Sequence, residues 1–234
     1  LVCSFNRLPL TRRFLSSICS SLGLSVSISV TLVDNNSTDG TFEMLSSFSE
    51  SLNLTVISTP RDMYWSEAMR FGYEHLVASG YEYDFLISAN DDLILRETWI
   101  VELYNLYIEN KMKFEDSVVV FPVLDEMSCT VAYGGQRCIF SFMRSLIKPI
   151  NSISLWSRCD SFNMNFVVFS KAVLESVGFI DDRFIHSLGD FDLGLRCSKY
   201  GVPVWSAPFH IGFCNRNKVD ESPFDQSLGI YQRF

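Results

Sequence analysis

Several common catalytic and binding motifs are absent from this 234-residue sequence. It has no Gly-x-Gly-x-x-Gly, no Gly-x-x-x-x-Gly-Lys-Ser/Thr, no His-Glu-x-x-His and no Gly-x-Ser-x-Gly, so the sites built on those motifs are not indicated. The seven cysteines are odd in number, and none shows Cys-x-x-Cys spacing. Structural zinc and a disulfide framework are therefore not expected, and we expect reduced thiols in a cytoplasmic protein.

Positive charge and long apolar runs are also scarce. Nineteen Lys and Arg against 27 Asp and Glu give a net charge of -8, which argues against general nucleic-acid binding. A nucleotide remains a suitable ligand, because a divalent cation can bridge carboxylates to phosphates. No apolar run reaches the roughly 18 residues of a transmembrane helix, and no signal peptide is apparent. Because Leu1 falls within an expected strand, we expect residues to precede it.

Apolar residues are plentiful, at 47% of the chain, and their spacing alternates between two periods. Strands are expected at 1–4, 26–33, 54–57, 85–88 and 118–121. Helices are expected at 11–22, 40–48, 66–77 (with Ser66 as the N-cap) and 98–107. Strand and helix thus alternate at least four times before residue 122. This predicts an α/β fold with a central, mostly parallel sheet flanked by helices, in a single domain over 1–234.

Two polar loops follow expected strands, at the sheet edge where α/β proteins bind ligands. The loop from Asp34 to Thr41 could hold a base or ribose by hydrogen bonds, or it could be a polar turn in which Asp39 or Thr38 caps the next helix. Asp91 and Asp92 are adjacent and repel each other. A hard cation or a basic partner between them would explain the pair, although two solvated carboxylates are the plainer interpretation.

Two later segments carry further candidates. Asp192 is placed to cap an expected helix over 193–200, and Asp190 precedes it where a carboxylate could face a cleft as a general base. A lone histidine such as His210 is more often a hydrogen-bonded structural residue than a ligand. It gains interest if it meets Asp92 in space, because two oxygens and an imidazole make a divalent metal site.

Taken in order, these segments resemble the family 2 glycosyltransferases with the GT-A fold, with the bacterial rhamnosyltransferase-like subgroup nearest. The likeness covers nearly the whole chain apart from residues 127–159. The matching segments are CSFNR at 3–7, VDNNSTDGT at 33–41, YWSEAMRFG at 64–72, NDD at 90–92, GDFDL at 189–193, HIG at 210–212 and YQRF at 231–234.

The resemblance implies roles for individual residues. Residues 1–122 would be the nucleotide-binding half, and 123–234 would bind the acceptor and carry the base. Asp190 would be the catalytic base, with Gly189 standing where an acid often precedes it. Asp92 and His210 would approach Mg²⁺ or Mn²⁺ and the diphosphate. Donor-nucleotide contacts would come from Asp34, Asn36, Asp39, Trp65, Arg70, Asn90 and Asp91, although Asn90 replaces the usual first acid of an Asp-x-Asp motif.

The implied reaction is an inverting, metal-dependent transfer from a UDP- or dTDP-hexose to a glycan or lipid-linked acceptor in cell-surface polysaccharide synthesis. One base and one displacement suffice for inversion. A sugar nucleotidyltransferase is an alternative, but residues 6–9 lack its glycine-rich basic loop. A non-catalytic glycan-binding or scaffolding relative is another, given Asn90 and Gly189.

Residues 127–159 differ in charge from the rest of the chain. They contain Arg137, Arg144, Lys148 and Arg158 and no acid, so this segment carries +4 and the remainder -12. From 140 to 150 the apolar spacing is nearly helical. The segment could be an insertion that completes the core, or an acceptor-side element making weak peripheral contact with the inner face of an anionic membrane.

Overall fold

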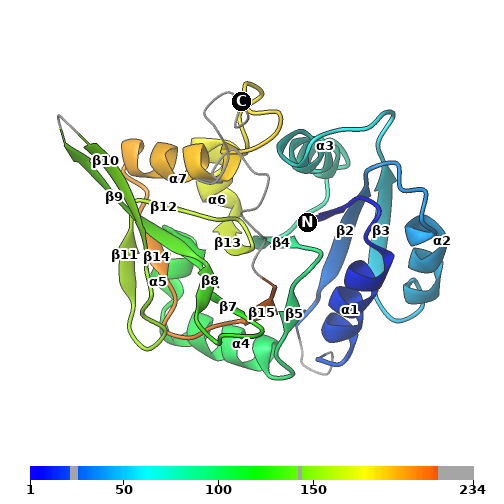
Figure 1. Cartoon of the computed structure of the whole chain (residues 1–234), viewed down its shortest axis with the longest axis horizontal. Coiled ribbons are helices and arrows are strands. Elements are labelled where there is room, and N and C mark those ends of the chain that lie inside the picture. Colours follow the sequence, from blue (N-terminus) through cyan, green and yellow to red (C-terminus); the bar gives the residue numbers. More distant parts are fainter. Residues whose placement is uncertain (22–25, 142–143, 216–234) are drawn as a thin grey trace.

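The computed structural model of the chain describes residues 1–21, 26–141 and 144–215, which form a layered α/β arrangement (Figure 1). Its helices are α1 (Leu8–Cys19), α2 (Thr41–Leu45), α3 (Trp65–Ala78), α4 (Trp99–Glu109), α5 (Lys111–Glu115), α6 (Lys171–Val177) and α7 (Gly189–Lys199), with a short 3-10 turn at Ser46–Phe48.

The strands fall into a large sheet and two small ones. The large sheet holds β11 (Ser157–Cys159), β14 (Val204–Ser206), β6 (Val118–Val120), β13 (Phe166–Ser170), β4 (Phe85–Asn90), β1 (Val2–Ser4), β2 (Ser29–Asp34) and β3 (Asn53–Ser58), in that order. The small sheets hold β10 (Arg144–Pro149), β9 (Gly135–Ser141) and β12 (Ser161–Phe162), and β5 (Ile94–Leu95), β15 (Gly212–Cys214), β7 (Val123–Asp125) and β8 (Val131–Tyr133).

The large sheet is mostly parallel, as predicted. Strands β1, β2, β3, β4, β6 and β14 run one way, and only β13 and β11 run against them. Strands from both halves of the chain share this sheet, since β13 lies between β4 and β6. The carboxyl ends of β1, β2 and β4 therefore meet at one edge, where Ser4 pairs with Asp34 and Cys3 with Asn90.

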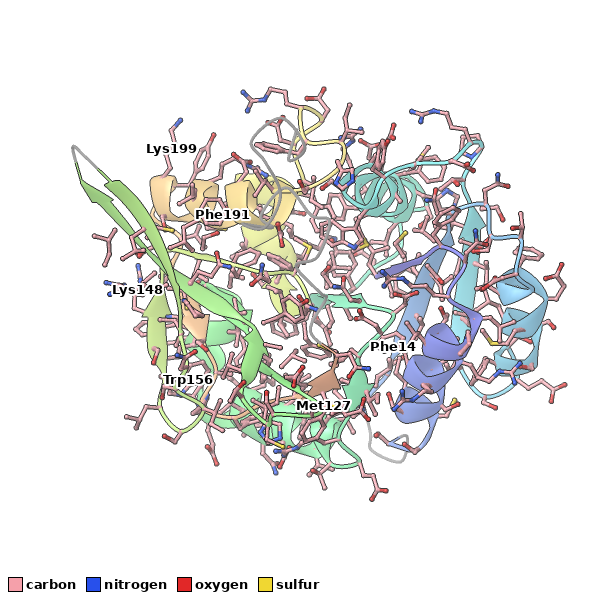
Figure 2. The ribbon with its side chains drawn as sticks, in the orientation of Figure 1. Phe14, Met127, Lys148, Trp156, Phe191 and Lys199 are labelled. Carbon is pink, nitrogen blue, oxygen red and sulfur yellow. The ribbon has the colours of Figure 1, made fainter. Side chains whose placement is uncertain are left out.

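Helices cover both faces of the large sheet, and each face has its own apolar core. Helices α1, α2 and α4 pack on one face through side chains such as Phe14, Leu45 and Trp99 (Phe14 is labelled in Figure 2). Helices α3, α6 and α7 pack on the other through Met69, Leu174 and others. Burial of these side chains supplies most of the stabilisation, at about 25 cal/mol for each Å² of apolar surface removed from water.

The predicted elements of the first 122 residues are all present, with ends shifted by at most three residues. Two predicted caps are wrong. Helix α3 begins at Trp65 after an extended Tyr64, so Ser66 is already helical. Helix α7 begins at Gly189, because the chain turns at Leu188 in a left-handed conformation (φ 68°). Asp192 therefore lies in the first turn of α7, where it accepts a hydrogen bond from Arg196 at 2.6 Å.

The near-helical spacing over 140–150 is also misleading, because this segment belongs to the antiparallel hairpin β9–β10. Ile139 lies opposite Leu146, and Cys138 lies opposite Ile147. Apolar residues fall in adjacent pairs such as Leu146 and Ile147, a spacing that resembles a helix over so short a stretch but also occurs in a strand with apolar residues on both faces. The hairpin extends beyond the rest of the fold in Figure 1. None of the described helices is both long and apolar enough to cross a membrane.

Candidate functional site

Several of the candidate residues lie at the carboxyl edge of the large sheet. The loop after β1 carries Arg7, the loop after β2 carries Asp34, and the loop after β4 carries Asp91. The loops are joined directly, since Thr38 N–H donates to Asn6 Oδ1 at 2.7 Å and Asn6 N–H donates to Ser37 Oγ at 3.0 Å. An open parallel sheet binds ligands at such an edge.

Asp34 ends β2 as a buried residue with one free acceptor. Its Oδ2 accepts the Ser37 N–H at 3.3 Å, whereas Oδ1 is buried with no hydrogen-bond partner among the described residues. The neighbouring Asn35 holds the segment after β3 in place, because its Oδ1 accepts from Thr59 Oγ1 at 3.1 Å and from Met63 N–H at 2.9 Å. Asp34 therefore keeps an acceptor available for a ligand.

Asn36 and Asp39 make contacts with the protein itself. Asn36 has positive φ (62°), and its Nδ2 donates to Asp62 Oδ1 at 2.9 Å on the surface. Asp39 accepts the Leu8 N–H at 2.9 Å and the hydroxyl of Thr41 at 2.5 Å. These donors lower the pKa of Asp39. Asp39 thereby fixes the start of α1 beside the start of α2, and its nucleotide contact stays a prediction.

The Asp91–Asp92 pair lies directly after β4, and both side chains are largely enclosed by the protein. Asp91 Oδ1 lies 3.1 Å from Arg7 Nη1, and Asp91 Oδ2 accepts from Thr11 Oγ1 at 3.1 Å. Asp92 Oδ2 lies 3.6 Å from the same Arg7 nitrogen. Burial raises the pKa of both carboxyls, and the charge of Asp91 raises the pKa of Asp92 further.

One oxygen of Asp92 and one of the neighbouring Asn90 suit a hard cation. Asn90 Oδ1 and Asp92 Oδ1 are buried without a hydrogen-bond partner in the part of the chain that the structure describes. Carboxylate and amide oxygens are ligands for Mg²⁺ and Mn²⁺. Among the described residues no group of three or more His, Cys, Asp or Glu is arranged as a complete metal site. Further ligands would have to come from the donor's phosphates or from water.

Asp190 lies at the start of α7, and its carboxylate is held by two main-chain donors. Its Oδ1 accepts the Phe191 N–H at 2.8 Å, and its Oδ2 accepts the Met164 N–H at 3.2 Å. Burial raises the pKa of Asp190, and the two N–H donors partly oppose that rise. The residue after Met164 contacts the end of β4, because Asn90 N–H donates to Asn165 O at 3.2 Å. Consecutive residues 164 and 165 thus connect Asp190 to the loop that carries Asp92.

The presence of glycine rather than an acid at position 189 has a steric explanation. A Cβ at this position would lie 2.7 Å from Ile180 Cγ2, 3.0 Å from Ser66 Oγ and 3.4 Å from Phe184 Cβ. Neighbouring side chains thus occupy the space in which an acid preceding Asp190 would stand. Ser66 Oγ itself is buried without a partner among the described residues.

The start of α3 brings Trp65 and Arg70 to the α7 side of the site. Trp65 is half-buried against the core shared by α3, α6 and α7. Arg70 Nη1 donates to Asp181 O at 3.4 Å, and its Nε lies 3.6 Å from Glu74. Tyr64, just before α3, is exposed and packs on His186 with ring centroids 4.6 Å apart. The nucleotide contacts of Trp65 and Arg70 stay predictions.

His210 has a different set of neighbours from Asp92. Its ring packs edge-on against Phe213 at 5.3 Å. Burial and then the charge of Arg96 lower its pKa, while Glu102 acts in the opposite sense. The charged neighbours of Asp92 are Asp91 and Arg7. The shared cation of Asp92 and His210 stays a prediction.

Sequence reasoning missed three residues that build this edge: Arg7, Thr11 and Asn35. All three stand in or beside segments that were singled out, but their partners lie far away in sequence. Arg7 and Thr11 contact Asp91 from 84 and 80 positions away in the sequence, and Asn35 contacts Met63. The unexplained pair of adjacent acids was the available signal, because it called for a basic partner.

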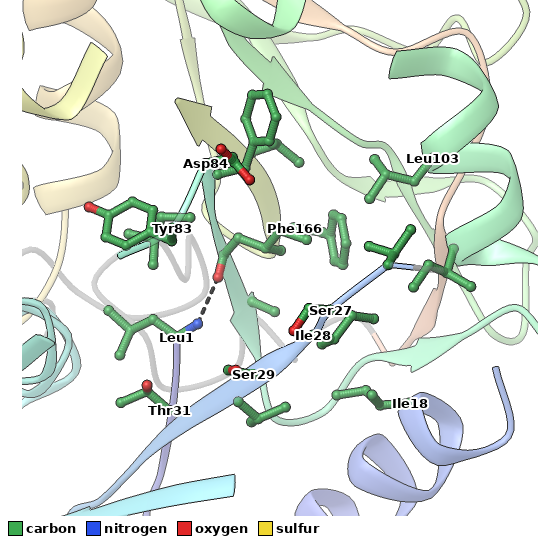
Figure 3. A pocket seen from close by; sticks show the side chains of 18 of the residues that line it. Leu1, Ile18, Ser27, Ile28, Ser29, Thr31, Tyr83, Asp84, Leu103 and Phe166 are labelled. Carbon is green, nitrogen blue, oxygen red and sulfur yellow. Dashed lines mark hydrogen bonds between the residues drawn. The ribbon is translucent and has the colours of Figure 1, made fainter. Parts of the chain in front are cut away.

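A pocket of about 590 Å³ lies elsewhere, at the amino ends of β2 and β4 (Figure 3). Its lining is mostly apolar and includes Ile18, Ile28, Leu103 and Phe166. It contains none of the candidate site residues. Because ligands of parallel sheets bind at carboxyl ends, this pocket is not the candidate site.

Comparison with known proteins places these features in context. The family model described as Glycosyl transferase family 2 matches residues 1–171. No curated protein sequence gives a significant match. Among solved structures, S. aureus TarS 1-349 matches with a TM-score of 0.66 at 13% identity, over 92% of this chain and 59% of that chain.

Two complexes of the same protein match similarly. TarS 1-349 with UDP-GlcNAc gives a TM-score of 0.64 at 10% identity, over 93% of this chain and 58% of that one. TarS 1-349 with UDP gives 0.64 at 13% identity, over 92% and 59%. The chain thus spans less than two thirds of these structures. At identities this low, the structural similarity establishes a shared fold and nothing further.

Proposed function

The chain belongs to glycosyltransferase family 2 and has the GT-A fold, and on that premise we propose that it is an inverting hexosyltransferase. The proposed reaction moves a sugar from a UDP- or dTDP-hexose to a hydroxyl of a glycan or lipid-linked saccharide. The observation that carries the proposal is the loop at 164–165, which is hydrogen-bonded to Asp190 on one side and to Asn90 on the other. It supports a base and a diphosphate site that share one edge of the sheet.

The donor would lie along the carboxyl edge. Asp34 Oδ1 lacks a partner among the described residues and suits an N–H of the base. Asn90 Oδ1 and Asp92 Oδ1 suit Mg²⁺ or Mn²⁺ bound with the diphosphate. When bound, that cation would neutralise the charge developing on the leaving diphosphate. The TarS complexes with UDP-GlcNAc and UDP support a nucleotide-sugar donor.

Asp190 would act as the general base. It would accept the proton of the acceptor hydroxyl while that oxygen forms a bond to the anomeric carbon and the bond to the diphosphate breaks. Burial makes the carboxylate a stronger base than an exposed aspartate, and the N–H groups of Met164 and Phe191 fix its direction. A single displacement from the opposite face inverts the anomeric configuration.

A panel of UDP- and dTDP-hexoses tests the proposal. We expect slow, Mn²⁺-dependent release of the nucleoside diphosphate from at least one donor, and faster release once a suitable acceptor is added. The control is Glu50→Gln, an exposed carboxylate just before the amino end of β3. Absence of release from every donor would favour the non-catalytic alternative.

The hairpin β9–β10 supports the proposed membrane contact. Ile139, Leu146, Ile147 and Lys148 are all exposed, and apolar side chains stand on both of its faces. Figure 2 shows Lys148 at the outer side of the fold. Such a hairpin suits the inner face of an anionic membrane, where each basic residue contributes about 1 kcal/mol. This location agrees with seven free cysteines and with a role in cell-surface polysaccharide synthesis.

Vesicle co-sedimentation tests this contact. We expect weak, salt-sensitive pelleting with phosphatidylglycerol-containing vesicles, and its loss when Arg144 and Lys148 both become Glu. A single Lys148→Glu change should weaken pelleting where Lys199→Glu, the same charge change on α7, does not. Absence of pelleting at low salt, or equal pelleting of all variants, would show that the hairpin is not a membrane contact.

A further inference from the structure

Arg7 is a charged residue at the donor edge to which the proposed reaction assigns no role. Its Nη1 lies 3.1 Å from Asp91 Oδ1 and 3.6 Å from Asp92 Oδ2, so one guanidinium nitrogen faces both carboxylates of the pair. The Arg7 side chain is 44% exposed, whereas those of Asp91 and Asp92 are 3% and 13% exposed. The cation is thus the solvent-facing and movable member of the cluster.

The backbone of Arg7 is held much more firmly than its side chain. Asn6, just before it, has positive φ (51°) and is bound to Ser37 and Thr38. Leu8, just after it, donates its N–H to Asp39. The guanidinium, in contrast, is tied only by the aspartates among its described contacts. The Arg7 backbone is thus fixed at the edge of the sheet, while its guanidinium can turn toward solvent.

The two aspartates differ in what they have left to offer. Both oxygens of Asp91 accept hydrogen bonds, from Arg7 and from Thr11, and Thr11 is held in turn by Ser4 at 2.7 Å. Asp92 has the longer contact to Arg7 and a buried Oδ1 with no partner among the described residues. Asp91 is therefore an anchor for Arg7, and Asp92 is the carboxylate free to take a second cation.

Charge bookkeeping then sets the order of events. Two carboxylates and one guanidinium leave the cluster at -1. A divalent cation alone would bring it to +1, with two like-signed cations a few ångströms apart. A diphosphate of charge about -2 returns the cluster to -1 and gives the displaced guanidinium an anionic partner.

We propose that Arg7 is a resident cation that opposes divalent-metal binding at Asp92 until a nucleotide diphosphate is present, and then pairs with that diphosphate. The inference rests on the proposed function, because it assumes a nucleotide-diphosphate donor. It makes metal and donor binding mutually dependent, and this dependence is reciprocal by thermodynamic linkage. A free metal ion would then be held weakly by the empty enzyme.

The test measures Mn²⁺ binding by titration, with and without UDP, in the wild type and three variants. Without UDP, Arg7→Gln should bind Mn²⁺ about tenfold more tightly than the wild type, since a repelling charge is gone. The factor by which UDP strengthens Mn²⁺ binding should be about tenfold smaller in Arg7→Gln than in the wild type. Arg7→Lys should change both quantities less and in the same direction. Arg13→Gln on α1, which loses a surface ion pair with the distant Glu126, should match the wild type.

The outcomes separate the two claims. Equal or weaker Mn²⁺ binding by Arg7→Gln without UDP overturns the inference even if the wild type transfers sugar. A wild type that neither binds UDP with Mn²⁺ nor releases UDP from any donor overturns the proposed function, and this inference with it. Should Arg7→Gln fail to fold, as judged by circular dichroism, Arg7→Lys decides. Mn²⁺ binding by that variant equal to wild type, with an unchanged effect of UDP, contradicts the role of the guanidinium.

Discussion

At the scale of single residues, the carboxylates of the site have different environments and are suited to different tasks. Asp39 is exposed, its pKa is lowered, and its oxygens hold the starts of two helices. Asp91 is buried and satisfied by Arg7 and Thr11. Asp190 combines a raised pKa with two fixed N–H donors. The sequence could identify these positions, but not their distant partners, because contacts such as Asp190 with Met164 and Asp91 with Arg7 join residues 26 and 84 positions apart.

Replacement of the proposed base is the sharpest change at this scale. Asp190→Asn should lower transfer by about 10² to 10⁴ because the amide keeps the shape but cannot accept the proton. Binding of UDP with Mn²⁺ should change little, since Asp190 lies at the start of α7 and Asp92 lies in the loop after β4. The two measurements are a transfer assay and a nucleotide titration. Wild-type activity in Asp190→Asn would show that the residue is structural.

The pH profile gives a second check on Asp190. The base must be ionised, so transfer should fall as pH decreases through its pKa. Because burial raises that pKa, the acid limb of kcat/KM should lie above the value of an ordinary aspartate. The limb should vanish from the residual activity of Asp190→Asn. An acid limb that persists unchanged in this variant would assign the titration to another group.

At the scale of elements, the position of the base depends on how closely the starts of α3 and α7 approach. Gly189→Ala places a methyl group 2.7 Å from Ile180 Cγ2, so either the Ile180 side chain or the helix start must shift. We expect a loss of about 1 to 3 kcal/mol in the free energy of unfolding, more than the gain in helix propensity returns. Urea unfolding measures it, with Lys199→Ala at the exposed end of α7 as the control. Equal stability of both variants would mean that the contact is loose.

Elements were predictable from the sequence where one period dominated. The buried strand Phe85–Asn90 and helix Trp65–Ala78 are long enough for the pattern to be unambiguous. The hairpin β9–β10 was not, because its apolar residues fall in adjacent pairs such as Leu146 and Ile147, and the spacing of such pairs also fits a helix. Helix starts were also missed. At α7 a left-handed Leu188 sets the boundary, and no local rule selects leucine for that conformation.

At the scale of the whole molecule, alternation of strands and helices predicted the architecture, and the order of the motifs predicted the family. Alternation could not indicate that β13 inserts antiparallel between β4 and β6, which depends on chain crossings far from any local pattern. That insertion brings residues 164–165, just before β13, beside Asn90. The molecule consequently has two distinct ends: a polar carboxyl edge and an apolar pocket at the amino ends.

The central claim is that this carboxyl edge binds a nucleotide with a divalent cation, and calorimetric titration of UDP in the presence of Mn²⁺ tests it most directly. The wild type should bind UDP, and Asp92→Asn should bind it at least tenfold more weakly because the proposed ligand of the cation would lose its charge. Tyr104→Phe, in the lining of the apolar pocket, should match the wild type. Undiminished UDP binding by Asp92→Asn, or its loss in Tyr104→Phe, would contradict the account.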